Sequence, residues 1–114
     1  MENCLFCGMV AGDIPCDKVY EDDSYLAFRD INPQAPVHLL IIPKRHLASV
    51  ADLDPADAGI IGDLAVIGSR LAGEAGLNPG GFRWVFNCGD DGGQTVPHIH
   101  LHLLGGRRLD WPPG

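Results

Sequence analysis

Three histidines alternate with apolar residues in the segment Pro97-His98-Ile99-His100-Leu101-His102-Leu103-Leu104. Successive side chains of a β-strand point to opposite faces, so the spacing predicts a strand over 98–104 with its three imidazoles on one face. Histidine is a poor strand former, and partly buried imidazoles need hydrogen-bond partners. Packing alone therefore explains the pattern poorly, and two kinds of chemistry remain: metal binding and attack on a substrate.

Strand geometry disfavours one metal ion shared by all three rings. At about 3.3 Å per residue the Cα atoms of His98 and His102 lie about 13 Å apart, a span that Zn–N bonds of about 2.0 Å bridge only at full stretch. An oxygenase-type site would add a carboxylate to two histidines. The carboxylates available after the long helix have no obvious ligand spacing; they are Asp90, Asp91 and Asp110.

A nucleophilic histidine requires fewer additional residues than a metal site does. A neutral imidazole can attack an electrophilic centre, and His100 has one imidazole on each side to stabilise an anion or deliver a proton. Immediately upstream, the turn Gly92-Gly93-Gln94-Thr95 can offer backbone N–H groups and a hydroxyl to phosphate oxygens. An ordinary hairpin loop is the alternative interpretation of that turn. Together the two segments favour attack by His100 on phosphorus.

The composition fits one folded domain spanning residues 1–114. A chain of 114 residues is about one domain in length, and a hydrophobic fraction of 46% supports a core. The formal net charge of −7 argues against general nucleic-acid binding. No apolar run is long enough for a membrane span, and the N-terminus does not resemble a signal peptide. We therefore expect a cytoplasmic protein with its four cysteines as thiols or metal ligands.

The periodicity and turn signals predict an α+β fold with one five-stranded antiparallel sheet, one long helix and a short N-terminal helix. The short helix is expected over 4–11. The long helix begins at the N-cap Asp54 with Pro55 in its first position, and ends at Gly76. Small residues along this helix would let it lie close to the sheet. The predicted strands are 18–21, 25–29, 37–42, 82–87 and 98–104.

The segment 98–104 matches the signature H-φ-H-φ-H-φ-φ, where φ is apolar, and so resembles the histidine triad family. Further segments resemble the branch of histidine triad nucleotide-binding proteins that hydrolyse purine nucleoside phosphoramidates, and they occur in the same order along nearly the whole chain. They are Cys4-Leu-Phe-Cys7, Ile14-Pro15, Tyr20-Glu-Asp-Asp23, Ala27-Phe-Arg-Asp-Ile31, Pro33-Gln-Ala-Pro36, Ile42-Pro-Lys44, Asp91-Gly-Gly-Gln94 and Leu104-Gly-Gly-Arg107.

The resemblance implies a role for each matching residue. His100 would form a covalent nucleotidyl-histidine intermediate, supported by His102, His98 and the additional histidine His38. Asp30 and Ile31 would hold the ribose. The remaining substrate-binding positions are Asn87, Gly93, Gln94 and Thr95 around the phosphate and leaving group, and Phe6, Phe28 and Leu40 as an apolar slot for the base, with plain core as the alternative for these three.

The resemblance also implies metal-free catalysis with no required cofactor, and a homodimer in which two sheets join and Trp111 reaches the partner's site. Some relatives hold a structural zinc ion, for which the matching residues here are Cys4, Cys7, His46 and His98; His98 would then support His100 instead of donating a proton. Two positions depart from the family pattern, because Thr95 replaces a usual serine and Pro97 an expected aromatic residue. A nucleotide-binding interaction module with incidental hydrolysis, a related hydrolase of other nucleotidyl conjugates, and a structural zinc protein stay as alternatives.

Overall fold

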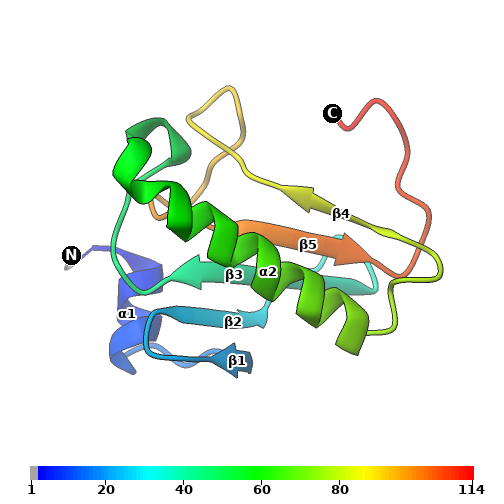
Figure 1. Ribbon diagram of the computed structural model, residues 1–114, viewed down its shortest axis with the longest axis horizontal. Coiled ribbons are helices and arrows are strands. Elements are labelled where there is room, and N and C mark those ends of the chain that lie inside the picture. Colours follow the sequence, from blue (N-terminus) through cyan, green and yellow to red (C-terminus); the bar gives the residue numbers. More distant parts are fainter. Residues whose placement is uncertain (1–2) are drawn as a thin grey trace.

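The computed structural model describes residues 3–114, whose five strands form one antiparallel sheet beside two α-helices, an α+β architecture. The sheet order is β1-β2-β3-β5-β4 (Figure 1). The elements are α1 (Leu5–Ala11), β1 (Lys18–Glu21), β2 (Tyr25–Arg29), β3 (Val37–Pro43), α2 (Ala58–Glu74), β4 (Phe82–Val85) and β5 (Leu101–Gly105). Five strands and two helices were expected from the sequence, and this prediction is confirmed. No helix in the described part of the chain could cross a membrane.

The two helices begin and end at the residues that their capping signals indicate, with one difference. The Cys4 thiol accepts from the Cys7 N–H at the start of α1, and Gly12 ends α1 with a φ of 84°. Asp54 caps the segment before α2 as predicted, but Pro55–Asp57 form a 3-10 turn. The α-helix proper therefore starts at Ala58, three residues later than the Pro55 start that the sequence indicates.

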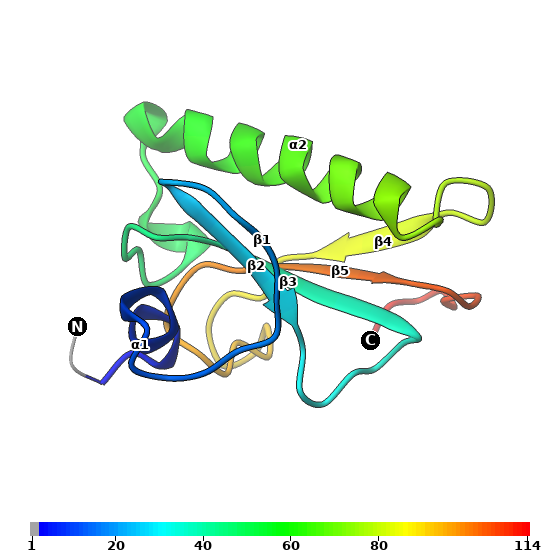
Figure 2. The same cartoon turned by 90° about the horizontal axis from the view of Figure 1, so that it is seen from below.

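The sheet carries a separate apolar cluster on each face. Helix α2 covers one face, while α1 and the C-terminal segment lie on the other side (Figure 2). The α2 face joins Leu64, Ile67 and Leu71 of the helix to apolar side chains of the triad segment, namely Ile99, Leu101 and Leu103. The α1 face holds Phe6, Met9, Leu26, Phe28, Leu40 and Ile42. The histidines therefore belong to the α1 side, as the alternation predicts.

Helix α2 approaches the sheet closely at one glycine. A Cβ added to Gly68 would lie 3.2 Å from a Leu101 methyl and 3.2 Å from the indole nitrogen of Trp84. The corresponding position at Gly59 or Gly62 meets nothing within 4 Å. Close packing through a small residue is thus confirmed at Gly68.

The triad segment is strand only in its second half. The prediction of a strand over 98–104 is corrected to Leu101–Gly105, because His98 N–H bonds to the Val96 carbonyl at 2.8 Å in a tight turn and Ile99 N–H bonds to Leu47 at 2.8 Å. Strand β4 ends at Val85 instead of the predicted residue 87. Its last paired residue, Val85, lies opposite His102, close to the first residue of β5.

Candidate active site and metal site

The three triad histidines lie beneath α1 at the start of β5. His98 is fully buried and His100 is 5% exposed, while His102 is half-buried. The Phe6 ring of α1 meets both buried imidazoles edge-on, with centroid distances of 5.1 Å to His100 and 5.9 Å to His98. These contacts restrict the orientation of the two rings before any substrate arrives.

The hydrogen bonds of His100 leave one of its nitrogens free to attack. Its Nδ1 lies 2.7 Å from the backbone carbonyl of His98. A carbonyl can only accept, so Nδ1 carries the proton and Nε2 keeps its lone pair. Every buried side-chain nitrogen or oxygen within residues 3–114 has a hydrogen-bond partner. Nε2 of His100 has no partner among these residues, so it is not a buried atom, and solvent or a substrate can reach it.

A chain of hydrogen bonds fixes the proton of His102 in the same way. The backbone N–H of Gln34 donates to Nδ1 of His38 at 3.0 Å, which places the proton of a neutral His38 on Nε2. That Nε2 lies 2.9 Å from Nδ1 of His102 and 3.4 Å from an Asp30 carboxylate oxygen. Donation over the shorter distance leaves His102 with its own proton on Nε2, ready to be given away.

Burial keeps these imidazoles neutral near pH 7. The loss of hydration lowers the pKa of His100 and of His38 below that of a free imidazole. For His102, burial and the neighbouring His100 and His38 lower the pKa to about 4. A neutral ring at position 100 can act as a nucleophile, and a neutral ring at position 102 can still donate its one proton.

His98 faces away from the other two and takes part in a separate cluster. Its Nε2 donates to the Pro43 carbonyl at 2.8 Å, so Nδ1 has the lone pair. That Nδ1 lies 3.3 Å from the Cys4 sulfur, 3.5 Å from the Cys7 sulfur and 3.2 Å from Nδ1 of His46. Both nitrogens of His98 are thus occupied by groups outside the triad, which removes it as a proton donor.

The distances within this cluster are those of a tetrahedral zinc site. Around a zinc ion with bonds of about 2.3 Å to sulfur and about 2.0 Å to nitrogen, two nitrogens lie about 3.3 Å apart and a sulfur lies about 3.5 Å from a nitrogen. The nitrogens of His46 and His98 are 3.2 Å apart, and the Cys7 sulfur lies 3.3 Å from the His46 nitrogen. The four residues predicted as ligands are brought together, and their donor set fits zinc.

Asp30, His38 and His102 form a second group whose potential ligand atoms lie within 4.8 Å of one another. A metal bound at Nε2 of neutral His38 would move the ring proton to Nδ1, where the Gln34 N–H already points at 3.0 Å. Two N–H groups would then face each other. This group is better described as a proton relay than as a metal site.

The glycine-rich loop between β4 and β5 is held by its own side chains. The Asn87 amide donates to the Gly92 carbonyl at 2.7 Å. The Gln94 amide donates to Ala48 at 2.7 Å and to Val96 at 3.0 Å, and accepts from Gly89 N–H at 3.1 Å. Gln94 therefore shapes the loop with its side chain. Thr95 next to it is exposed.

The other predicted substrate residues fall into an exposed and a buried set. Ile31 is 95% exposed next to Asp30, and Trp111 is 81% exposed in the C-terminal segment. Phe6, Phe28 and Leu40 are buried together in the core on the α1 side. Of the three, Phe6 contacts the triad itself.

Sequence reasoning missed two groups that set the protonation of the site: the N–H of Gln34 and the carbonyl of Pro43. Both belong to the backbone. A backbone group is present at nearly every residue, so side-chain type gives no signal for it. Gln34 lies in the Pro33–Pro36 segment that resembles the family, but its residue type gives no indication that its backbone amide meets His38.

Comparison with known proteins agrees with this geometry. The family model described as "HIT domain" matches residues 11–109. A HIT-like protein of Synechococcus elongatus is 48% identical over 113 residues, covering 99% of this chain and 98% of that protein.

Two solved structures are also similar. A HIT family hydrolase from Legionella pneumophila superimposes with a TM-score of 0.97 at 53% identity, covering 98% of this chain and 100% of that one. A zinc-bound histidine triad family protein from Mycobacterium smegmatis gives a TM-score of 0.80 at 35% identity, covering 96% of this chain and 79% of that one. The chain, with its triad of His98, His100 and His102, belongs to the histidine triad (HIT) family.

Proposed function

We propose that this protein hydrolyses the P–N bond of purine nucleoside 5′-phosphoramidates through a nucleotidyl intermediate on His100. The observation that carries the proposal is the state of the His100 ring, which is oriented by the His98 carbonyl at 2.7 Å and whose Nε2 has no partner among residues 3–114. The similar Legionella pneumophila protein, described as a hydrolase, supports hydrolytic chemistry. The resemblance of several sequence segments to purine phosphoramidases supports the substrate class.

The reaction would proceed in two displacements. First, Nε2 of His100 attacks phosphorus and the P–N bond breaks, with Nε2–H of His102 giving its proton to the departing amine. The lone pair of the attacking nitrogen forms the new N–P bond. Water then attacks the same phosphorus, the N–P bond to His100 breaks, and His102 recovers a proton from the water. The product is the nucleoside monophosphate, and no metal is needed for either step.

The surrounding residues would bind the substrate without opposing its charge. Asp30 and Ile31 lie beside the relay and would hold the ribose, with Asp30 accepting from the sugar hydroxyls. Gly93 and Thr95 of the loop would donate to the phosphate. Phe6, Phe28 and Leu40 would form the apolar floor beneath the base. Local donors of this kind allow an anionic substrate to bind a chain of net charge −7.

A mass measurement on the trapped intermediate tests the proposal. Wild type, His100→Ala and the control variant Cys16→Ser, whose change lies outside both histidine clusters, are mixed with adenosine 5′-phosphoramidate, quenched and weighed intact, while AMP release is followed in parallel. We expect one added AMP moiety in wild type and Cys16→Ser and none in His100→Ala, whose turnover should fall at least about 1,000-fold. Equal AMP release by wild type and His100→Ala would refute the assignment. A bound but uncleaved nucleotide in both would favour an interaction module.

We also propose a structural zinc ion on Cys4, Cys7, His46 and His98. The tetrahedral spacing of their donor atoms supports it, as does the zinc-bound relative from Mycobacterium smegmatis. None of the four cysteines forms a disulfide, so the sulfurs of Cys4 and Cys7 are available as ligands, as expected in the reducing cytosol where we place the protein. The ion would tie α1 to the start of β5 and to the loop after β3. It would thereby hold Phe6 against His100 and take no part in bond cleavage.

The exposed edge of β4 supports a homodimer. Strand β4 lies at one edge of the sheet, and its Phe82 and Trp84 remain 38% and 37% exposed. An unpaired edge strand with exposed aromatic side chains is a ready surface for pairing with a second copy. We propose that two β4 strands pair in this way and that Trp111 of each chain reaches the site of the other.

A further inference from the structure

A cavity of about 770 Å³ lies at the opposite end of β5 from the triad. It is bordered by the turn between α2 and β4, the start of β4 and the segment that follows β5, and it opens to the surface. Gly106 begins this last segment, four residues after His102, which corresponds to about 13 Å along a strand. None of the residues assigned above to hydrolysis or to zinc lines this cavity.

Three arginines line the cavity, and among residues 3–114 they are the arginines that pair with no carboxylate. Of the eight lysines and arginines in the chain, five form ion pairs with carboxylates: Lys18, Arg29, Lys44, Arg45 and Arg70. The other three are Arg83, Arg107 and Arg108, and none of them forms an ion pair within residues 3–114. The chain has 15 acidic residues, and these three arginines without carboxylate partners give it a local positive region at the cavity.

Two of these guanidinium groups are positioned by backbone carbonyls, and the third is free. Arg83 donates to the carbonyls of Leu109 and Asp110 at 3.1 Å and 2.8 Å. Arg107 donates to Gln34 and Arg108 carbonyls at 2.9 Å each. Arg108 makes no side-chain hydrogen bond in the described residues. Carbonyls orient a guanidinium but do not neutralise its charge, so an anion would find donors already in place.

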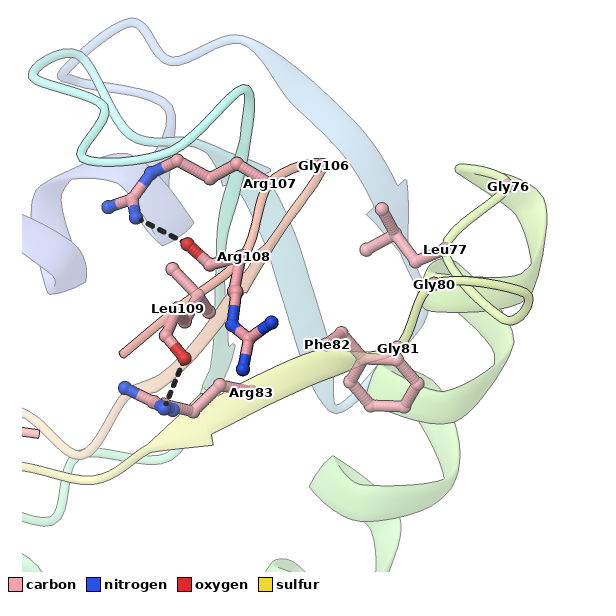
Figure 3. A pocket seen from close by; sticks show the side chains of 10 residues that line it. All are labelled: Gly76, Leu77, Gly80, Gly81, Phe82, Arg83, Gly106, Arg107, Arg108 and Leu109. Carbon is pink, nitrogen blue, oxygen red and sulfur yellow. Dashed lines mark hydrogen bonds between the residues drawn. The ribbon is translucent and has the colours of Figure 1, made fainter. Parts of the chain in front are cut away.

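The rest of the lining suits an organic group attached to that anion. Figure 3 shows the guanidinium group of Arg108 on the side of Leu77 and Phe82, whereas those of Arg107 and Arg83 extend to the left, toward the carbonyls that they bond. A Cβ added at Gly80 or Gly81 would meet nothing within 4 Å, so the backbone of that turn is open to close approach. The cavity thus combines a strongly positive wall with an apolar one.

From this arrangement we infer that the cavity is a second binding site, separate from the triad, for a small phosphate monoester with an apolar or aromatic group. The guanidinium group of Arg108 offers planar N–H pairs that fit phosphate oxygens, and the charges of Arg83 and Arg107 beside it favour a dianion over a singly charged carboxylate. The organic group would rest against Leu77, since Phe82 belongs to the β4 edge assigned above to pairing with a second copy. Binding should weaken as salt screens the attraction between the arginines and the phosphate.

Titration of the ¹⁵N-labelled protein with phenyl phosphate tests this site. We expect saturable shifts of the Gly80, Gly81 and Gly106 amides. Arg108→Gln should weaken the binding about ten-fold or more, since it removes a charged donor that has no structural partner. Arg70→Gln, which removes an arginine paired outside the cavity, should leave the affinity unchanged. Inorganic phosphate should bind more weakly than phenyl phosphate, because it lacks the group that contacts the apolar wall. Equal affinities would contradict the role of the apolar wall and leave a site for free phosphate.

The site does not depend on the proposed hydrolysis, and the experiment keeps the two apart. His100→Ala should retain the shifts at Gly80 and Gly81, and Arg108→Gln should retain the hydrolysis of adenosine 5′-phosphoramidate. Shifts confined to residues around the triad would overturn the inference. So would an Arg108→Gln variant that binds phenyl phosphate like wild type but has lost self-association, because the cavity would then be part of an interface between two copies.

Discussion

The backbone N–H of Gln34 donates to Nδ1 of His38 at 3.0 Å and so decides which nitrogen of a buried imidazole carries the proton. Through the 2.9 Å contact between His38 and His102, the same bond decides which proton His102 can deliver. A single amide of the Pro33–Pro36 loop therefore sets the protonation of the relay.

Replacing this amide should slow hydrolysis although no side chain of the triad changes. Gln34→Pro removes the N–H, whereas Gln34→Ala retains it and loses only the side-chain bond to the Asn32 carbonyl. An unsatisfied Nδ1 costs about 1–3 kcal/mol and allows the other tautomer of His38. We expect kcat of Gln34→Pro to fall about ten-fold or more, with Gln34→Ala near wild type. Equal rates for the two variants would remove Gln34 from the relay.

His102 should matter most for leaving groups that need a proton. In His102→Asn, cleavage of an AMP conjugate with an alkylamine should slow by about 100-fold or more, the usual contribution of a general acid. An AMP ester of p-nitrophenol, whose leaving group departs as a stable anion, should be affected far less. Steady-state rates with the two substrates measure the difference. A uniform loss on both would assign His102 to phosphate binding instead.

The neutral imidazoles should make the fold less stable as the solution is acidified. The pKa of His102 is lowered to about 4 by burial and by its imidazole neighbours, against about 6.5 in an unfolded chain. Between these values the unfolded state binds more protons, so stability falls from about pH 6.5 towards pH 4 and is independent of this group above pH 6.5.

Thermal unfolding between pH 7 and pH 4.5 measures this effect. His102→Asn should lose less of its melting temperature over the range than wild type. The groups facing His102 are His38, His100 and Asp30, and they remain in the variant. Identical pH dependence in the two proteins would show that His102 is charged or exposed in solution.

Zinc content should depend on Cys4 and not on Cys16. Cys16 is a half-buried free thiol outside the four-residue cluster, so Cys16→Ser serves as a matched control. We expect about one zinc per chain in wild type and Cys16→Ser, and little in Cys4→Ser, whose melting temperature should fall because α1 loses its tie to the sheet. Elemental analysis of protein purified without chelator gives the content. Less than about 0.1 zinc per chain in wild type would reject a tight site.

Self-association should depend on the β4 edge. Trp84→Glu places a charge among the exposed aromatic side chains of that edge and should give a monomer, whereas Trp84→Phe retains an apolar ring and should remain a dimer. Light scattering after gel filtration gives the masses, and circular dichroism verifies that the variants fold. A monomeric wild-type protein at tens of micromolar would contradict the proposed dimer.

The sequence by itself determined the elements and the faces on which their residues lie. Alternation placed Ile99, Leu101 and Leu103 against α2 and the histidines on the opposite side, because a pleated chain keeps that period through the turn before β5. Capping signals located α2 to within one turn, and the resemblance to zinc-holding relatives pointed to Cys4 and Cys7 as ligands. These are local properties, which short stretches of chain can encode.

The tertiary structure decided what each imidazole does. His98 and His100 have the same residue type and similar burial, yet one directs its lone pair into a cluster with Cys4, and the other has its lone pair on Nε2 with no partner among the described residues. The difference arises from which nitrogen meets a carbonyl: that of Pro43, 55 residues away, or that of His98, two residues away. Proton positions follow from contacts of the imidazoles with backbone groups that only folding brings close to them. Residue type and spacing therefore do not predict these positions.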